Sequence, residues 1–356
     1  MKTKSKFVAL IGLGYWGKNI LRNLYELRVL HSACDVNSEL LKEKKEIYPD
    51  INFTLSLEEI LKSPEIKAVA VATPSETHYD IAKSILLAGK DVFVEKPLAL
   101  NSSQGRELVM LAKEQNCILM VGHILHYHSA IIKLKQMITI GKLGQIQYVY
   151  SNRLNIGKLS IGENILWSFA SHDISILLSL LEEPLINVSA FGEDIINKGI
   201  YDTALVNLEF KSGIKGHIFV NWLHPFKEQK LVIVGSIGMA VFDDVSMEKL
   251  YFYPHKIETK IGTVPVVHKA DYQIIQVDCN ESLKEELKHF IDCIINRKKP
   301  ITDGKEGLKV LEVLEIAENS LKDYKSNKNI KIQKVYYPYN NSHISNNIIF
   351  AKDTVI

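Results

Sequence analysis

A glycine-rich turn directly after a short apolar run constrains this chain more than any other feature. The run Phe7–Ile11 is followed by the letters GLGYWG, and a helical pattern begins at Lys18. In the spacing G-x-G-x-x-G the first glycine permits a tight turn, the second lets the backbone approach a pyrophosphate, and the third lets the helix pack close to the strand. The order of strand, turn and helix therefore predicts a dinucleotide-binding domain. The turn residues expected at the cofactor are Gly12, Gly14, Tyr15, Trp16 and Gly17.

The second apolar run, His31–Asp35, ends in a carboxylate 18 residues after Gly17. A carboxylate at this place accepts hydrogen bonds from the ribose hydroxyls of a dinucleotide. Because Asp35 would also repel a 2′-phosphate, the sequence favours NAD over NADP. The alternative is a glycine turn that binds nothing, with Asp35 as a solvated loop residue.

The first third of the chain alternates apolar runs with amphipathic segments. This alternation predicts a doubly wound α/β Rossmann domain with a parallel sheet over residues 1–122. From Gln145 the strands become longer and alternate apolar with polar residues, which predicts an α+β second domain over residues 123–330 with a large, mostly antiparallel open sheet. One helix bearing Ile174, Leu177, Leu178 and Leu181 is expected to pack on that sheet, and another is expected over 307–321. Residues 331–356 are expected to form a C-terminal tail.

Composition excludes several classes of partner. The chain has 43 basic and 41 acidic residues and a net charge of +2, so no strong field draws it to nucleic acid or to an anionic membrane. A small molecule is the expected partner. The four cysteines are far apart and form no C-x-x-C pair, which indicates reduced thiols in a cytoplasmic protein and neither a metal site nor a disulfide framework. No apolar stretch approaches the roughly 20 residues that a transmembrane helix needs.

Two further groups of polar residues follow apolar strands. Thr73 and Pro74 come after the fourth strand and His78 begins the next helix, so all three are expected to border the cofactor. The alternative is a helix cap with an exposed histidine. After the fifth strand come Glu95 and Lys96. The proline at position 97 biases Lys96 away from helical geometry, so its amine is expected to project into the crevice.

An amine in that crevice orients a substrate hydroxyl, or acts as a base where desolvation lowers its pKa. For Glu95 and Lys96 taken alone, a solvated turn is the competing interpretation.

Four stretches, GLGYWGKN, ACDVN, VATPSETH and VFVEKPLAL, resemble the Gfo/Idh/MocA family of oxidoreductases in their order and spacing. The similarity extends to GLKVLEVLEIAENSLK and covers most of the chain. It implies that Glu95, Lys96 and Pro97 form the family's Glu-Lys-Pro signature, in which the lysine contacts the reacting hydroxyl beside the nicotinamide. It also implies that the open sheet packs against another subunit, in a homodimer or homotetramer.

The family carries a second motif, D-x-G-x-H, whose histidine lies near the substrate carbon. The matching stretch runs from Ser168 to His172, so the histidine is present and the aspartate is replaced by serine. Asp173 is adjacent, but neighbouring residues on a helix do not face each other. The resemblance makes Lys96 and His172 the catalytic candidates, and which of them takes the proton stays open. Without the resemblance, His172 is a satisfied histidine at a helix start.

The stretches SNRLNIGKLSIGENILWSFASHDIS and VNWLHPFKEQKLVIVGS resemble a branch that acts on nucleotide-activated sugars, including UDP-N-acetylhexosamine and UDP-N-acetylhexosaminuronate 3-dehydrogenases. Arg153 suits a phosphate or carboxylate, Asn155 and His123 suit hydroxyls, and Trp167 or Tyr127 suits stacking on a ring. The alternatives are a strand-end charge for Arg153 and core positions for the aromatic residues. The H-x-H pair at His126 and His128 lacks further ligands nearby and does not indicate a metal.

The resulting hypothesis is NAD-dependent oxidation of a secondary hydroxyl, at carbon 3 of a UDP-linked N-acetylated sugar, to a keto sugar. Such a ketone can accept an amino group from a separate aminotransferase, as in the synthesis of surface-polysaccharide precursors. Three alternatives remain: oxidation of a free polyol such as inositol or of a free sugar, a non-catalytic NAD-binding regulator suggested by Ser168, and NADPH-dependent reduction of a non-sugar ring, which Asp35 disfavours.

Overall fold

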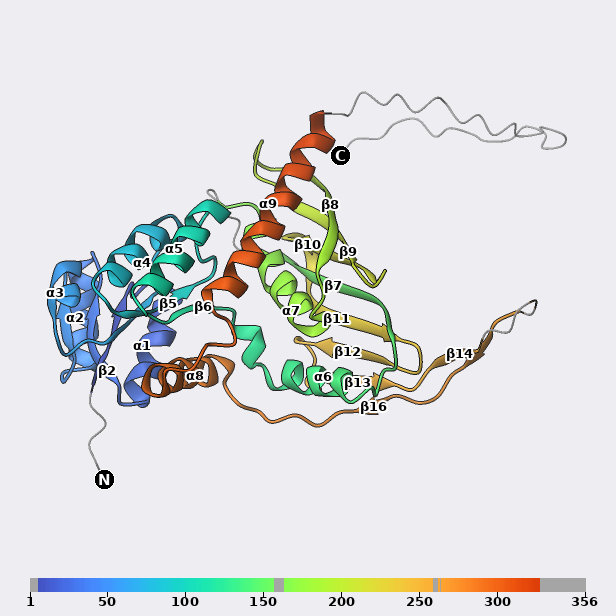
Figure 1. The fold of residues 1–356 in the computed structure, drawn as a ribbon, viewed down its shortest axis with the longest axis horizontal. Coiled ribbons are helices and arrows are strands. Elements are labelled where there is room, and N and C mark those ends of the chain that lie inside the picture. The colour runs from blue at the N-terminus through green and yellow to red at the C-terminus, as the bar shows by residue number, and fades with distance from the viewer. Residues whose placement is uncertain (1–5, 157–162, 259–261, 263, 327–356) are drawn as a thin grey trace, which may run out of the picture.

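A computed structural model describes residues 6–156, 163–258, 262 and 264–326 of the chain. The predicted tail, 331–356, lies outside these residues. Two bodies are visible side by side, a layered domain at the N-terminal end and a broad sheet covered by helices (Figure 1).

The first domain is a six-stranded parallel sheet with helices packed against it. The strand order is β3-β2-β1-β4-β5-β6, which is the order of the dinucleotide-binding fold. Its strands are β1 (Val8–Ile11), β2 (Leu30–Cys34), β3 (Asn52–Thr54), β4 (Ala68–Val71), β5 (Asp91–Glu95) and β6 (Leu119–Gly122). Its helices are α1 (Gly17–Glu26), α2 (Ser38–Ile47), α3 (Leu57–Lys62), α4 (His78–Leu87) and α5 (Ser102–Glu114). The predicted Rossmann fold is confirmed.

The central strands read as continuous apolar runs because helices cover both faces of a parallel sheet. Every residue of β1, β4 and β6 is buried. The residues that follow these strands, at their carboxyl ends, therefore share one edge of the sheet. That edge carries the glycine turn after β1 and the Glu95–Lys96 pair at the end of β5.

The second domain is built on an eight-stranded sheet with the order β16-β13-β12-β11-β7-β10-β9-β8. The pair β7–β10 is parallel, and the other recorded pairs of this sheet are antiparallel. The predicted large, mostly antiparallel sheet is thus confirmed. Its strands are β7 (Ile146–Ile156), β8 (Leu185–Glu193), β9 (Thr203–Phe210), β10 (Lys215–Asn221), β11 (Leu223–Gly235), β12 (Met239–Asp243), β13 (Leu250–Tyr253) and β16 (Gln273–Ile274). A separate hairpin pairs β14 (Lys256–Glu258) with β15 (Val266–His268).

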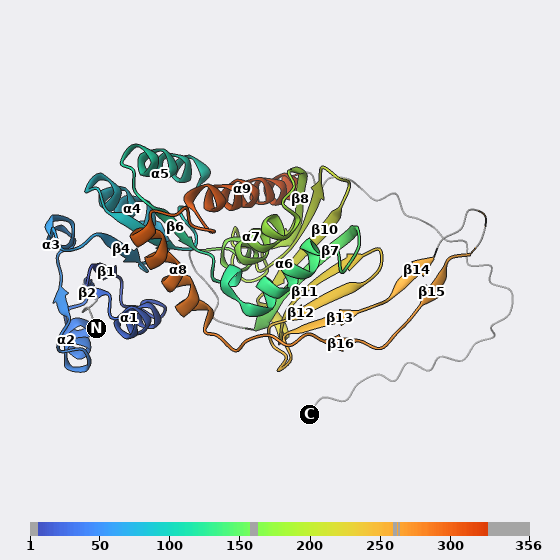
Figure 2. The same ribbon diagram turned by 60° about the horizontal axis from the view of Figure 1, so that its bottom comes forward.

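Helices of the second domain cover one face of its sheet, and one of them, α9, also packs against α5 of the first domain (Figures 1 and 2). They are α6 (Ser129–Thr139), α7 (Ser171–Leu181) and α9 (Gly304–Ser326), accompanied by the short turns η2 (Ile124–Tyr127) and η3 (Leu166–Ala170). The turn η1 (Ser75–Thr77) belongs to the first domain, where it precedes α4. In α7, Ile174 and Leu177 are fully buried in the same core as Val149 and Ile218 of the sheet. The predicted packing of this helix is confirmed.

One helix of the C-terminal region returns to the first domain. The apolar face of α8 (Ser282–Asn296) joins the core that contains Leu10 and Ala33. The rings of Phe290 in α8 and Phe93 in β5 have centroids 5.8 Å apart. The sequence-based boundary at residue 122 assigns α8 to the second domain, whereas its packing makes it a helix of the first sheet. None of the helices in the described part of the chain is long and apolar enough to cross a membrane.

Candidate active site

The glycine turn has the geometry that a dinucleotide requires. Gly12 has φ +91°, and a Cβ added there would lie 2.6 Å from the carbonyl oxygen of Ala72. A Cβ on Gly17 would lie 2.0 Å from the carbonyl oxygen of Gly12. Around Gly14, in contrast, nothing lies within 4 Å of an added Cβ. The first and third glycines are therefore demanded by close packing, while the second leaves open space in which a pyrophosphate fits.

Asp35 ties the end of β2 to this turn. Its Oδ2 accepts a hydrogen bond from the backbone N–H of Leu13 at 2.7 Å, and its Oδ1 accepts one from the N–H of Asn37 at 2.9 Å. A carboxylate offers about four lone-pair sites, so both oxygens retain capacity for ribose hydroxyls. The turn and Asp35 together fit a dinucleotide.

Glu95 connects the end of β5 to the glycine turn. The indole Nε1 of Trp16 donates a hydrogen bond to Glu95 Oε1 at 2.5 Å. Burial raises the pKa of Glu95 to about 7, against the opposing effect of that bond. Tyr15, one residue before, is 85% exposed and touches Lys18 through a cation–π contact at 5.0 Å. Trp16 thus ties the turn to Glu95, while the Tyr15 ring stays exposed.

The buried ring of His78 contacts the backbone of the segment that follows β4. The His78 ring is buried, with Nδ1 2.7 Å from the carbonyl oxygen of Pro97 and Nε2 2.9 Å from that of Thr73. The Thr73 hydroxyl accepts a hydrogen bond from Thr77 at 2.7 Å. Pro74 precedes the turn η1. His78 therefore braces the two edge loops against each other, with both ring nitrogens turned toward backbone rather than toward a cofactor.

Lys96 reaches across from the first domain to the second. Its Nζ donates a hydrogen bond to the backbone carbonyl of Ser168 in η3 at 3.1 Å. Burial lowers the pKa of Lys96, and the nearby carboxylates of Glu163 and Glu95 oppose that shift. The position that holds aspartate in the family motif thus contacts the lysine through its backbone, where the identity of the side chain does not matter.

His172 lies in the first turn of α7, directly after the π-helical turn η3. Its Nδ1 is buried and has no hydrogen-bond partner among the described residues. Burial, followed by the positive charge of Lys96, lowers the pKa of His172 well below its ordinary value. The ring is therefore neutral at physiological pH. An unprotonated nitrogen of such a ring, placed beside Lys96, is equipped to accept a proton.

Asp173 turns away from His172. Its carboxylate accepts hydrogen bonds from Arg153 Nε at 2.7 Å and from Arg153 Nη2 at 3.3 Å, and a third from Ser151 Oγ at 2.5 Å. Asp173 is accordingly a partner of the second sheet and not a replacement for the aspartate of the family motif. Two nitrogens of Arg153, Nε and Nη2, are thus bound to Asp173, while the charge of its guanidinium acts on Lys96 and His172.

The remaining predicted substrate contacts divide into two groups. His123 Nδ1 lies 2.5 Å from Glu306 Oε2, and Asn155 Oδ1 is buried without a hydrogen-bond partner among the described residues. These polar groups remain candidates for binding hydroxyls. Tyr127 and Trp167 are 5% and 7% exposed, and the Tyr127 hydroxyl lies 3.5 Å from Thr302 Oγ1 in the core. Both aromatic rings pack inside the fold.

The sequence motifs do not identify two acidic residues that lie at the site, Glu163 and Glu306. Glu163 acts on Lys96 through its charge, and burial raises the pKa of its own carboxyl. Glu306, near the start of α9, holds His123. Each comes from a segment distant in sequence from the glycine turn and from Glu95–Lys96, so only the fold brings them there.

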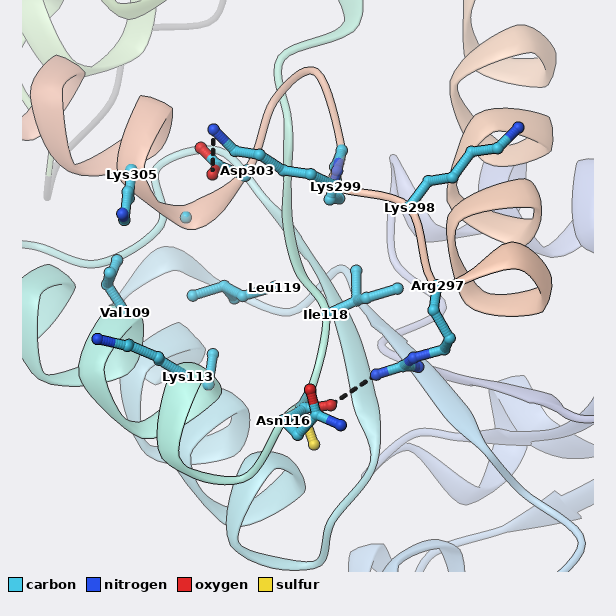
Figure 3. A pocket seen from close by; sticks show the side chains of 14 residues that line it. Val109, Lys113, Asn116, Ile118, Leu119, Arg297, Lys298, Lys299, Asp303 and Lys305 are labelled. Atoms are coloured by element: carbon cyan, nitrogen blue, oxygen red, sulfur yellow. Dashed lines mark hydrogen bonds and ion pairs between the residues drawn. The ribbon is translucent and has the colours of Figure 1, made fainter.

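A cavity of about 360 Å³ lies away from this site, at the amino end of β6 (Figure 3). Lys113 of α5 and Arg297, Lys298 and Lys299, which follow α8, contribute to its walls. Arg297 donates to the carbonyl of Asn116 at 2.5 Å and pairs with Asp91 at 2.7 Å. Because ligands of doubly wound sheets bind at the carboxyl ends of the strands, this cavity is not the candidate active site.

Comparisons with known proteins agree with this arrangement. Residues 6–123 match the family described as an oxidoreductase family with an NAD-binding Rossmann fold, and residues 131–241 match the Gfo/Idh/MocA C-terminal domain. The two matches cover more than half of the chain. It belongs to the Gfo/Idh/MocA family of oxidoreductases, as the sequence motifs predict.

Individual relatives are distant. A UDP-N-acetylglucosamine 3-dehydrogenase of Acidithiobacillus ferrooxidans is 24% identical over 307 residues, 85% of this chain and 92% of the relative. A scyllo-inositol 2-dehydrogenase (NAD(+)) of Bacillus subtilis is 26% identical over 257 residues, 68% of this chain and 72% of the relative.

Solved structures show the same fold. The structure of the A. ferrooxidans enzyme, GnnA, superposes with a TM-score of 0.78 at 22% identity, covering 89% of this chain and 97% of that one. GenD2 from gentamicin A biosynthesis, solved in complex with NAD, gives a TM-score of 0.77 at 21% identity, covering 91% of this chain and 96% of that one.

Proposed function

We propose that this oxidoreductase uses NAD to oxidise a secondary hydroxyl, at carbon 3 of a UDP-linked N-acetylated sugar, to a ketone. The observation that carries the proposal is the pair formed by Lys96 and His172. Both side chains are half-buried: Lys96 contacts the carbonyl of Ser168 at 3.1 Å, and His172 follows four residues later with its Nδ1 atom buried. Desolvation is the largest cause that lowers the pKa of each. Such a pair suits removal of a hydroxyl proton while hydride leaves the same carbon.

The roles divide by geometry. Lys96, anchored on the carbonyl of Ser168 at 3.1 Å, orients the substrate hydroxyl and stabilises the alkoxide that develops as its proton leaves. His172 accepts that proton at a ring nitrogen, because the ring is neutral. Bound NAD supplies the chemistry of a hydride acceptor, held by the glycine turn and Asp35. The Asp35 carboxylate supports NAD over NADP, since it would repel a 2′-phosphate.

The nucleotide sugar is supported by the UDP-N-acetylglucosamine 3-dehydrogenase, which resembles this chain over most of its length. A second candidate substrate, an inositol, is supported by the comparable identity of the scyllo-inositol enzyme and of a myo-inositol 2-dehydrogenase from Thermotoga maritima, 25% identical over 342 residues. In either case the chemistry at Lys96 and His172 is the same, and the substrates differ in what surrounds the reacting carbon.

A substrate panel separates the two candidates. Purified protein is mixed with stoichiometric NAD and, separately, with UDP-N-acetylglucosamine, its uronic acid, and free inositols, and the absorbance of reduced nicotinamide is followed. Reduction by a UDP-sugar alone supports the proposal. Reduction by an inositol alone replaces it with the polyol reaction, and NAD binding without reduction by any sugar or polyol contradicts both.

A further inference from the structure

A hydrogen-bonded group of four side chains extends from the candidate active site to the first turn of α9. His123 Nδ1 lies 2.5 Å from Glu306 Oε2, and the Ser175 hydroxyl donates to Glu306 Oε1 at 2.5 Å. His126 Nε2 lies 2.7 Å from Ser175 Oγ. Both oxygens of the Glu306 carboxylate are therefore fixed, one by His123 and the other by Ser175, which His126 holds in turn.

The inner end of this group lies at the strand edge that carries the reacting residues. His123 follows Gly122, the residue of β6 that lies opposite Glu95 of β5 in the sheet register. The charge of His123 acts on both His172 and Glu95. Only 3% of the His123 side chain is exposed, so a proton that arrives there has no direct contact with bulk water.

The outer end opens into a different cavity. Glu306 and His126 line a space of about 960 Å³ between α7, β8 and α9, together with Ser179, Lys305 and Lys309. The Glu306 side chain is 16% exposed. The lining residues of this cavity come partly from β8 and α9, which lie side by side away from the first strand and the glycine turn (Figure 1). A cofactor and a sugar bound at the carboxyl edge of the first sheet would leave it open.

Oxidation of a secondary hydroxyl needs such an exit. The carbon gives a hydride to the cofactor, the oxygen gives up one proton, and the C–O single bond becomes a double bond. One proton per turnover must therefore leave a site in which the His172 Nδ1 atom and the His123 side chain are buried. A route that does not pass the bound substrate lets the proton depart before the products do.

Resting on the function proposed above, we infer that His123 and Glu306 form a proton relay from the active site to the cavity between α7 and α9. A proton from the reacting site binds one ring nitrogen of His123 while the Nδ1 proton passes to Glu306 Oε2. Glu306 then releases a proton to cavity water. One proton enters and one leaves, and neither residue changes its net charge. The His123 ring then returns to its Nδ1-protonated tautomer before the next turnover.

The carboxylate is prepared for this role. Burial alone would raise the pKa of Glu306, but the charge and hydrogen bond of His123 outweigh that effect and hold the pKa well below its usual range. Glu306 is thus ionised between turnovers, and a proton that it receives from His123 is released readily to cavity water. Ser175 and His126 keep its second oxygen in place, which makes them positioning residues.

The first test needs no substrate. The exchange of the His123 Nδ1 proton with water is followed by NMR in protein that carries labelled histidine. Glu306→Gln preserves shape and hydrogen bonding but cannot carry a proton, so we expect exchange to slow by about tenfold or more, equivalent to a barrier raised by about 1.4 kcal/mol. Glu312→Gln makes the same change on the same helix and cavity and should leave exchange unaltered.

A rescue experiment separates proton transfer from support of the fold. Glu306→Ala removes the carboxylate and leaves space open to the cavity, so added formate should restore fast exchange in this variant and not in Glu306→Gln. If Glu306 is only a structural partner, either substitution loosens the site, exchange becomes faster, and formate changes nothing. Faster or unchanged exchange in Glu306→Gln overturns the relay.

A second readout uses turnover. With a sugar that reduces NAD, a pH-indicator dye reports proton release while nicotinamide absorbance reports hydride transfer. The relay predicts that the two signals coincide in the unaltered chain and that proton release lags by about tenfold in Glu306→Gln. Coincident signals in Glu306→Gln would contradict it. If no sugar reduces NAD, the proposed function fails, whereas the exchange experiment still decides whether the relay exists.

Discussion

Lys96 is the residue on which the proposed chemistry depends most. Lys96→Ala removes the group that orients the hydroxyl and stabilises the developing alkoxide, so kcat should fall by about 10²–10⁴-fold. The Kd for NAD should change little, because the glycine turn and Asp35 remain. Steady-state kinetics together with a binding titration check both expectations. Near-normal turnover of Lys96→Ala would remove Lys96 from the mechanism.

At the residue scale, the sequence predicts which residues lie at the sheet edge better than it predicts their hydrogen-bond and ion-pair partners. Lys96 lies at the edge expected from the strand that precedes it. Arg153 was expected to bind a ligand, which stays a prediction, and the structure adds a partner that was not expected, Asp173 at 2.7 Å. That pair joins β7 to α7, two elements whose contact is decided by tertiary packing. A charge pattern read along the chain contains no information about such a contact.

At the element scale, the turn between β1 and α1 offers a matched pair of substitutions. In Gly17→Ala the new Cβ meets the Gly12 carbonyl oxygen at 2.0 Å, so the helix must shift, at a cost of about 1–3 kcal/mol of unfolding free energy. In Gly14→Ala the new methyl group meets nothing within 4 Å. That variant should melt like the unaltered chain and bind NAD more weakly. Thermal melts and NAD titrations of both variants test this, and equal melting temperatures for the two would be incompatible with it.

Helix α8 contains a buried acid that makes stability depend on pH. Both carboxylate oxygens of Glu286 are buried without hydrogen-bond partners among the described residues. Burial, and then the charge of Glu95, raises the pKa of Glu286 well above its usual value. An acid whose folded-state pKa is raised binds its proton more tightly in the folded state. Its contribution to stability is therefore lost as pH rises above 4.5, the ordinary pKa of the group.

Glu286→Met should remove this dependence. We expect the free energy of unfolding of the variant to rise above that of the unaltered chain as pH increases. The difference should reach about 1–3 kcal/mol at pH values where desolvation of the Glu286 carboxyl costs most. Glu285→Met, which instead breaks a pair with Lys288 at 2.7 Å, serves as the control and should show no such gain. Denaturant unfolding over a pH series provides the measurement, and parallel curves for Glu286→Met and the unaltered chain would refute the assignment.

The place of α8 also shows the limit of prediction at this scale. Its own sequence predicts the helix, but the sheet that it packs against lies more than 150 residues earlier in the chain. The contact between Phe93 and Phe290 shows this separation. The alternation of strands and helices that defines the first domain ends near Gly122, so no periodic signal marks a later return. Packing of Leu287 and Phe290 into the first core decides it.

At the scale of the whole molecule, the outer face of the eight-stranded sheet carries partly exposed aromatic rings. Val149 and Ile218 point into the core that α7 completes, so the alternate residues of the same strands point the other way. These include Tyr150 and His217, whose rings stack with centroids 5.3 Å apart. Phe191 of the edge strand β8, which is 43% exposed, lies in register with Leu205 and Phe219 on this face. We propose that this face contacts a second copy of the chain in a homodimer, or in a homotetramer built from it.

Light scattering after size-exclusion chromatography tests this assembly. Tyr150→Glu places a charge in the centre of the face and should shift the mass toward that of one chain, whereas Ile140→Glu, at a 76% exposed position after α6, should not. A single-chain mass for the unaltered protein would rule the assembly out.

The central claim is that the crevice of Lys96 and His172 moves a hydride from carbon 3 of a nucleotide sugar to NAD. The most direct measurement uses UDP-N-acetylglucosamine carrying deuterium at carbon 3, mixed with the protein and stoichiometric NAD, followed by mass spectrometry of the cofactor. We expect reduced cofactor that carries one deuterium, together with a sugar whose carbon 3 is a carbonyl and has lost its deuterium. Reduced cofactor without deuterium, or cofactor that stays oxidised, would contradict it.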